Sequence, residues 1–136
     1  MTLEALTLSV ILALPHPPGE DHARSLAAAI ADAAHQAPLW VTGDGGEDHG
    51  SVPAGEAATA AVLVGIGIHE TGLAERLARC RYRKGEADAG RSLGTWQLLG
   101  PVARGPYRRL ELCASDALQA ERAVAVLALS RRAGLA

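Results

Sequence analysis

Glu70 is the side chain best placed for acid–base chemistry, because it is the first charged residue after the twelve uncharged residues 57–68. A carboxyl group at the point where a buried segment reaches the surface is partly withdrawn from water, which favours its protonated form. A protonated carboxyl near neutral pH is what a general acid requires. The pattern therefore makes Glu70 a candidate general acid, and it does not decide the assignment by itself. The alternative is that Glu70 only marks the polar end of a core helix.

A second carboxylate would come from the polar loop 80–91, which contains Glu86 and Asp88 among several basic residues. Paired carboxylates are the usual requirement for hydrolysing a glycosidic bond. Exposed acids beside basic residues are more often simply solvated. Both residues are therefore candidates for the second carboxylate, with a solvated loop as the alternative.

Other catalytic patterns are excluded by their context. Residues 90–94 spell G-x-S-x-G, but in α/β-hydrolases this turn follows a buried strand and precedes the catalytic His. Here a charged loop precedes it, and all five histidines lie at or before His69. The histidines lack the spacing of a zinc site, and Gly65 and Gly67 lack the third glycine of a dinucleotide loop. We expect no metal and no cofactor.

The elements that position these residues are expected to be helices in a single domain of 136 residues. Leu, Ala, Val and Ile must fill the core because aromatic residues make up only 3% of the chain, and this composition favours a mainly α fold. Residues 57–68 must be buried on all sides, and their pattern alone fits a strand or a helix. The remaining expectations are a helix at 20–37, a loop at 38–54, helical turns at 73–79, a short helix from Ser92 through Leu99 closed by Gly100 and Pro101, and a final helix beginning at an Asp116 N-cap with Gln119 three residues on.

The N-terminal residues 1–14 are apolar but include Glu4 and lack a basic start. They are too short to span a bilayer, which leaves a packed helix or a weak targeting segment. Cys80 and Cys113 flank the proposed active-site loop, and we expect them to form a disulfide; two buried thiols are the alternative.

The motif Glu70-Thr71-Gly72 is followed about twenty residues later by Ser92, Gly94 and Gln97 in the pattern S-x-G-x-W-Q. Over about residues 57–133 the chain resembles the lysozyme-like superfamily, in particular the soluble lytic transglycosylase and goose-type lysozyme branch and the related phage domains. The resemblance implies a small helical domain in which 57–68 is a helix and an active-site loop leads to a short G-x-x-Q helix. Residues 1–54 would add N-terminal helices and a loop.

The resemblance also implies the roles of the site residues. Glu70 would be the catalytic acid, and Ser92, Gly94 and Gln97 would bind the sugar. Tyr107, the only tyrosine after that loop, is the candidate for the family's tyrosine. The expected function is cleavage of the β-1,4 linkage of peptidoglycan glycan strands by a monomer in the periplasm, outside the cell or on a phage. A lytic transglycosylase is favoured over a hydrolase, because no second carboxylate is compelling. The alternative is a non-catalytic cell-wall-binding or phage-structural module.

Charge is divided unevenly along the chain. Residues 1–75 carry one basic and ten acidic residues, a sum of -9, whereas residues 76–136 carry twelve basic and five acidic residues, a sum of +7. The total of -2 argues against a generally basic nucleic-acid binder. Either the two halves pair inside the fold, which we favour, or the second half presents a cationic face to a polyanion such as a cell wall.

Overall fold

The computed structural model describes residues 1–39, 52–86, 88 and 90–134, with side chains up to residue 130. This part of the chain is mainly helical, as predicted. Most of the loop expected at 38–54 lies outside the described residues. The elements are α1 (Leu3–Leu12), α2 (Glu20–Gln36), α3 (Ala54–Thr71), α4 (Glu75–Ala78), β1 (Ser92–Leu93), β2 (Leu98–Leu99), α5 (Gly100–Arg104), α6 (Arg109–Ala114) and α7 (Asp116–Gly134).

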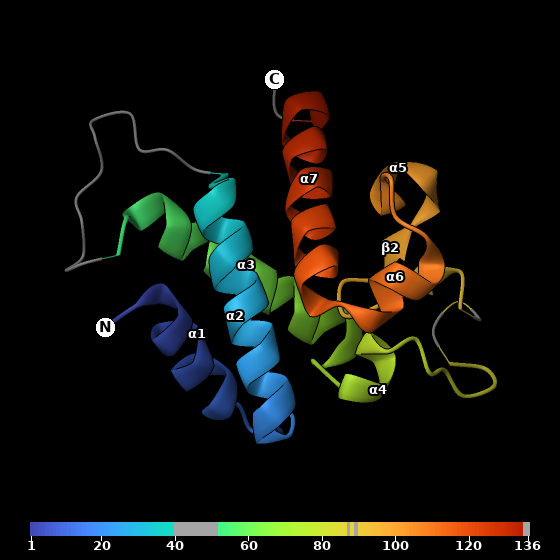
Figure 1. Cartoon of the computed structure of the whole chain (residues 1–136), viewed down its shortest axis with the longest axis horizontal. Coiled ribbons are helices and arrows are strands. Elements are labelled where there is room, and N and C mark those ends of the chain that lie inside the picture. The colour runs from blue at the N-terminus through green and yellow to red at the C-terminus, as the bar shows by residue number, and fades with distance from the viewer. Residues whose placement is uncertain (40–51, 87, 89, 135–136) are drawn as a thin grey trace.

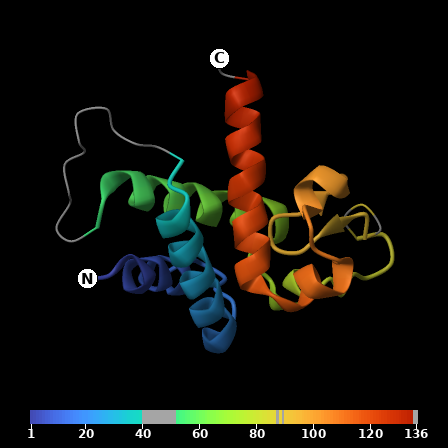
Figure 2. The same cartoon turned by 45° about the horizontal axis from the view of Figure 1, so that its top comes forward.

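Helix α3 runs behind α2 and α7 and reaches α4 at its C-terminal end (Figures 1 and 2). Its Leu63 and Val64 are buried in the core shared with α2 and α7. The prediction that 57–68 is buried on all sides is wrong, because Ala61 and Gly65 are exposed. These outward residues are small, so each leaves little apolar area in water.

Helices α1 and α2 pack against each other at the N-terminal side of the molecule (Figure 1). The expected helix at 20–37 is present as α2, which ends before Pro38 because proline disfavours helical geometry at the preceding residue. Of the alternatives for residues 1–14, the packed helix is present: Ile11 is fully buried, and Thr2 caps the first turn. None of the helices in the described ranges is long and apolar enough to cross a membrane.

The prediction of a short helix at 92–99 is wrong. Ser92 pairs with Leu99 and Leu93 with Leu98 in a two-stranded antiparallel hairpin. Gly94 and Gln97 have φ values of +75° and +50°, which a right-handed helix does not contain. Pro101 lies in the first turn of α5 rather than closing a helix, because proline's missing N–H costs nothing there.

The predicted N-cap of the last helix is displaced by one residue. The Ser115 hydroxyl accepts a hydrogen bond from the Leu118 N–H, so Ser115 caps α7. Asp116 and Gln119 are instead buried in the protein interior. The short helices α5 and α6 were not predicted, because neither has a periodic apolar pattern of useful length.

A disulfide joins Cys80, after α4, to Cys113 in α6, with a Cα–Cα distance of 5.6 Å. It closes a loop that contains the whole hairpin. We expect reduction to lower the free energy of unfolding by roughly 3–4 kcal/mol, because the reduced unfolded chain gains conformational freedom. Urea denaturation with and without reductant measures this change. The double variant Cys80→Ala/Cys113→Ala is the control, and its midpoint should not respond to reductant. Equal midpoints for reduced and oxidised wild type would contradict the expectation.

Candidate active site

Glu70 lies in the last turn of α3, one residue before Thr71, and its side chain is exposed. The expectation of a partly buried carboxyl is therefore wrong for the protein without a ligand. The buried face of this turn is formed by Gly67 and Thr71, which are four residues apart. Each helical residue is rotated by about 100° from the next, so Glu70 lies at the edge of that face, about 60° from Gly67 and about 100° from Thr71. Gly72 then ends the helix in a left-handed conformation with φ of +62°.

The hairpin is held against this same end of α3. The Thr71 hydroxyl donates a hydrogen bond to the Thr95 carbonyl at 2.9 Å, and the Trp96 indole N–H donates to the Leu63 carbonyl at 2.8 Å. A Cβ at Gly67 would lie 2.6 Å from Leu73 Cδ2 and 3.2 Å from Thr95 Cγ2, so only glycine allows this approach. The hairpin turn is thus fixed beside the helix end that carries Glu70.

Three predicted sugar-binding residues, Ser92, Gly94 and Gln97, lie together in the hairpin around the Tyr82 hydroxyl. This hydroxyl donates to the Ser92 carbonyl at 2.8 Å and accepts from the Gly94 N–H at 3.2 Å. The Gln97 side-chain amide donates to the Gly94 carbonyl at 2.9 Å. Tyr82 was missed by the sequence analysis, although an aromatic residue in an otherwise charged loop is a signal for such an anchor.

Asp88 and Glu86 both shape the loop that leads into the hairpin. Asp88 accepts hydrogen bonds from the Ser92 hydroxyl and, at 2.9 Å, from the Ser92 N–H; these bonds lower the pKa of its carboxyl. Glu86 forms a two-point ion pair with Arg76 and accepts from the Arg83 N–H at 2.9 Å. The pKa of the Glu86 carboxyl is lowered to about 2, mainly by its side-chain hydrogen bonding with Arg76. Both groups are anions engaged in loop contacts.

Tyr107 is connected to α7. Its hydroxyl donates to the Glu121 carboxylate, with oxygen–oxygen distances of 2.8 and 3.0 Å, and this contact raises the pKa of the phenol. Among the described hydrogen bonds, none joins Tyr107 to Glu70 or to the hairpin. The structure therefore does not bring Tyr107 together with the other predicted site residues.

Gln119 of α7 holds the hairpin from the side of the core and is fully buried. Its side-chain oxygen accepts from the Thr95 N–H at 2.9 Å. Its amide group donates to the carbonyls of Ala78 at 2.9 Å and Leu112 at 2.7 Å. A Cβ at Gly94 would lie 2.1 Å from the Gln119 side-chain oxygen, so this position also requires glycine. The sequence analysis treated Gln119 as part of a helix cap.

A buried polar cluster joins α2 to the start of α7 below this site. Asp116 forms an ion pair with Arg79 and accepts a hydrogen bond from the Ser25 hydroxyl. His22 Nδ1 lies 3.7 Å from the same carboxylate. Burial lowers the pKa of His22, whose Nε2 has no hydrogen-bond partner among the described residues. Asp116 therefore serves to anchor helices.

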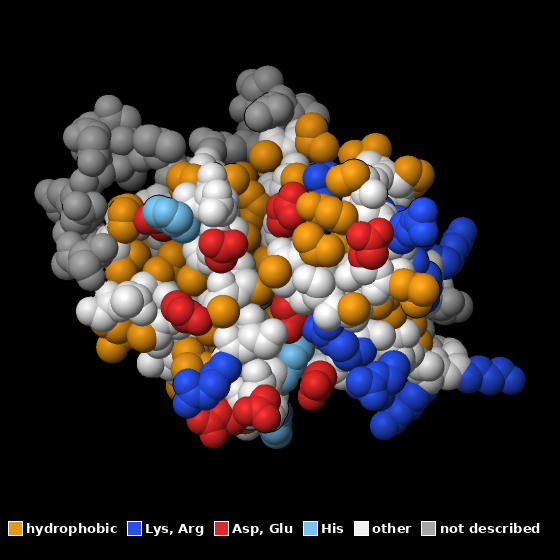
Figure 3. Space-filling model, in the orientation of Figure 1, with side chains coloured by type: hydrophobic (Ala, Val, Ile, Leu, Met, Phe, Trp, Pro, Cys, Tyr) orange, Lys and Arg blue, Asp and Glu red, His pale blue; other side chains and the backbone are white. Residues whose placement is uncertain are grey.

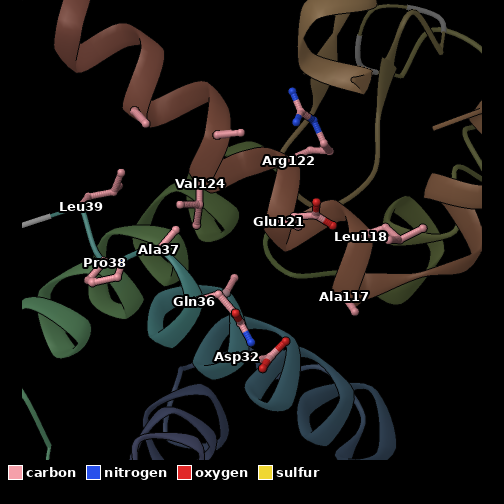
Figure 4. Close-up of a pocket in the computed structure, with 13 residues that line it drawn as sticks. Asp32, Gln36, Ala37, Pro38, Leu39, Ala117, Leu118, Glu121, Arg122 and Val124 are labelled. Carbon is pink, nitrogen blue, oxygen red and sulfur yellow. The ribbon is translucent and has the colours of Figure 1, made fainter. Parts of the chain in front are cut away.

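A groove of about 600 Å³ lies between α2 and α7 (Figure 4); its lining includes Glu121, the partner of Tyr107, but none of the predicted site residues. Asp32 and Gln36 line its α2 side, and Glu121 lies on the α7 side. Arg122 points toward α5, where it donates to the Ala103 carbonyl at 2.9 Å. Alanines occupy much of both helix faces here, which leaves the space between the helices partly empty. The sequence analysis did not predict this groove, because its two sides lie far apart in the chain.

No group of three or more His, Cys, Asp or Glu side chains in the described part of the chain could hold a metal ion. No protein-family model, no curated protein and no solved structure matches this chain. The chemistry of the site is therefore judged from its own residues. Glu70 is an exposed carboxyl at a rigid helix end, beside a hairpin fixed in place by buried hydrogen bonds.

Proposed function

We propose that the protein is a lysozyme-like glycosidase that cleaves the β-1,4 linkage between N-acetylmuramic acid and N-acetylglucosamine in peptidoglycan, with Glu70 as its acid and base. The observation that carries the proposal is the docking of the hairpin on the last turn of α3 through the Thr71–Thr95 hydrogen bond. This docking fixes the helix end that carries Glu70 against the hairpin that contains the proposed sugar-binding residues. Rigid placement of this kind is what a glycosidase needs for an aligned proton transfer.

A bound glycan strand would cover Glu70 and withdraw its carboxyl from water, which favours the protonated form that a general acid needs. Glu70 then donates its proton to the glycosidic oxygen as the bond from that oxygen to the anomeric carbon breaks. The N-acetyl oxygen of the same sugar attacks the anomeric carbon and carries the electron deficiency that a second carboxylate would otherwise stabilise. This route fits a site in which Glu86 and Asp88 are engaged in loop contacts.

In the second step the Glu70 carboxylate takes the proton of the sugar's 6-hydroxyl. The 6-oxygen attacks the anomeric carbon and displaces the N-acetyl oxygen. The product is a 1,6-anhydro sugar, and Glu70 is protonated again for the next cycle. The protein is thus proposed to act as a lytic transglycosylase, and no cofactor enters the reaction.

Mass spectrometry of purified peptidoglycan digested by the protein tests the reaction type. We expect soluble fragments that are lighter by one water than the corresponding hydrolytic fragments, because the anhydro ring forms without water. A muramidase that leaves reducing ends, run on the same substrate, supplies the reference masses. Fragments with reducing ends alone would overturn the transglycosylase assignment and make Asp88 or Glu86 the residue to vary next.

A non-catalytic cell-wall-binding or phage-structural module is the second candidate. It is favoured by the exposure of Glu70, which has no hydrogen-bond partner among the described residues, and by the engagement of both loop carboxylates. Such a module would co-sediment with insoluble peptidoglycan and release no soluble fragment from it. The same digestion therefore separates the two candidates.

A further inference from the structure

In the described part of the chain, the basic residues of the second half are not paired with the acids of the first half. Arg24 pairs with Glu20, whereas Arg76 and Arg79 pair with acids of their own half. Within the described residues, no Lys or Arg of 76–136 forms an ion pair with an acid of 1–75. The expectation that the two halves neutralise each other is therefore wrong for this part of the chain.

The unpaired cations gather on one side of the molecule. Figure 3 shows blue side chains over the right and lower right of the surface, whereas red side chains are more frequent toward the left, over α2. Residues 76–111 contain nine basic and three acidic residues. We call the exposed basic residues of this region the cationic face: Arg81, Arg83, Lys84, Arg91, Arg108 and Arg109.

The cationic face is built on two segments that are firmly connected. The Cys80–Cys113 disulfide ties the start of the loop to α6. One Arg109 nitrogen donates to the Gly90 carbonyl at 2.7 Å, which holds the start of α6 against the loop two residues before Ser92. Glu86 is paired with Arg76, whereas Asp88 and Glu111 remain anions near the cationic face. Two such charges offset only part of the charge of six cations, so the face keeps a net positive charge. The cations therefore form a persistent surface beside the hairpin.

We propose that the cationic face binds a flexible linear polyanion that carries phosphate or carboxylate groups, alongside the hairpin. Guanidinium groups bind both kinds of oxyanion through two parallel hydrogen bonds. The cations are exposed and spread over a loop and a helix start, so a chain of many charges gains more than a single ion does. The proposal does not depend on catalysis by Glu70.

A nucleic acid fits this surface less well. Single-stranded nucleic acids are usually held by aromatic side chains on which the bases stack. The aromatic residues of this region are Tyr82, Trp96 and Tyr107. Trp96 is buried, and the two tyrosines are half-buried with their hydroxyls bonded to the hairpin backbone and to Glu121. A polyanion without bases needs no aromatic side chains for stacking, so the full or partial burial of these side chains does not weaken its binding to this surface.

Binding of labelled inorganic polyphosphate, followed by fluorescence anisotropy, tests the proposal with the full chain. We expect the affinity to fall by about 100-fold between about 50 and 200 mM salt, because binding releases counterions from the polymer. At low salt, the triple variant Arg81→Gln/Arg83→Gln/Lys84→Gln should bind roughly 100-fold more weakly than wild type. The slope of log affinity against log salt concentration should become shallower by about 2. Poly-glutamate of matched charge shows whether phosphate or carboxylate is preferred.

Two control variants separate the cationic face from general charge. Arg81→Lys/Arg83→Lys keeps the charge and should retain most of the affinity, whereas Arg24→Gln removes a cation from α2 and should leave the affinity unchanged. Thermal denaturation checks that all variants are folded. The proposal is overturned if neither polymer binds, if the triple variant binds as wild type does, or if single-stranded DNA binds more tightly than both polymers.

Discussion

Glu70→Gln should reduce the release of soluble fragments from purified peptidoglycan by about 10²- to 10⁴-fold, which is the usual contribution of a positioned general acid. The amide has nearly the same shape as the carboxyl but cannot donate an acidic proton to the glycosidic oxygen. Because the Glu70 side chain is exposed and makes no described hydrogen bond, the substitution should leave the free energy of unfolding unchanged. The reaction is measured as the loss of turbidity of a suspension of purified cell walls.

Asp32→Asn is the matched control for this experiment. Asp32 is also an exposed carboxyl, but it lies on α2 at the groove between α2 and α7. Asp32→Asn should clear the walls at the wild-type rate. If Glu70→Gln also clears them at that rate, the catalytic assignment of Glu70 is wrong. If Asp32→Asn alone is inactive, the α2–α7 groove is the site.

Much of the fold could be predicted because the sequence signals of its long helices lie within the helices themselves or directly beside them. The acidic first turn, single apolar stripe and terminal Pro38 of α2 are all within one segment of sequence. The charge-free stretch in α3 was ambiguous between helix and strand, and the family resemblance, not the pattern, indicated the helix. The exposure of Ala61, Gly65 and Ile68 could not be foreseen, because the sequence does not show which sides of the helix the other elements cover.

The hairpin could not be predicted because its stability comes from outside its own segment. Ser92 to Leu99 has the spacing of a short capped helix, but Asp88, Tyr82 and Thr71 together hold it in another conformation. The position of Glu70 at the end of the charge-free stretch followed from the charge pattern, and the helical form of that stretch followed from the family resemblance. Its exposure did not, because the side of α3 that packs depends on Gly67 and the distant Thr95.

Gln119→Met should destabilise the protein by roughly 2–6 kcal/mol, because it leaves two buried polar groups without a partner and each costs about 1–3 kcal/mol. Methionine fills a similar volume, so the change removes hydrogen bonds with little change in packing. The Thr95 N–H and the Ala78 carbonyl lose the bonds described for them, and the Leu112 carbonyl keeps only the one from the Ser115 N–H. Urea denaturation followed by circular dichroism measures the loss.

Gln36→Met is the control, because Gln36 is exposed at the end of α2 and the same substitution there should change stability by less than about 0.5 kcal/mol. Since domains of this size are stable by about 5–15 kcal/mol, the Gln119 variant should lose a large part of its stability. Its hairpin should open first, because the Thr95 N–H connects the turn to α7. Reduced hydrogen-exchange protection at Gly94 to Gln97, in a variant that is still folded, would show this directly. A Gln119 variant as stable as the Gln36 control would mean that the hairpin is held by Thr71 and Trp96 alone.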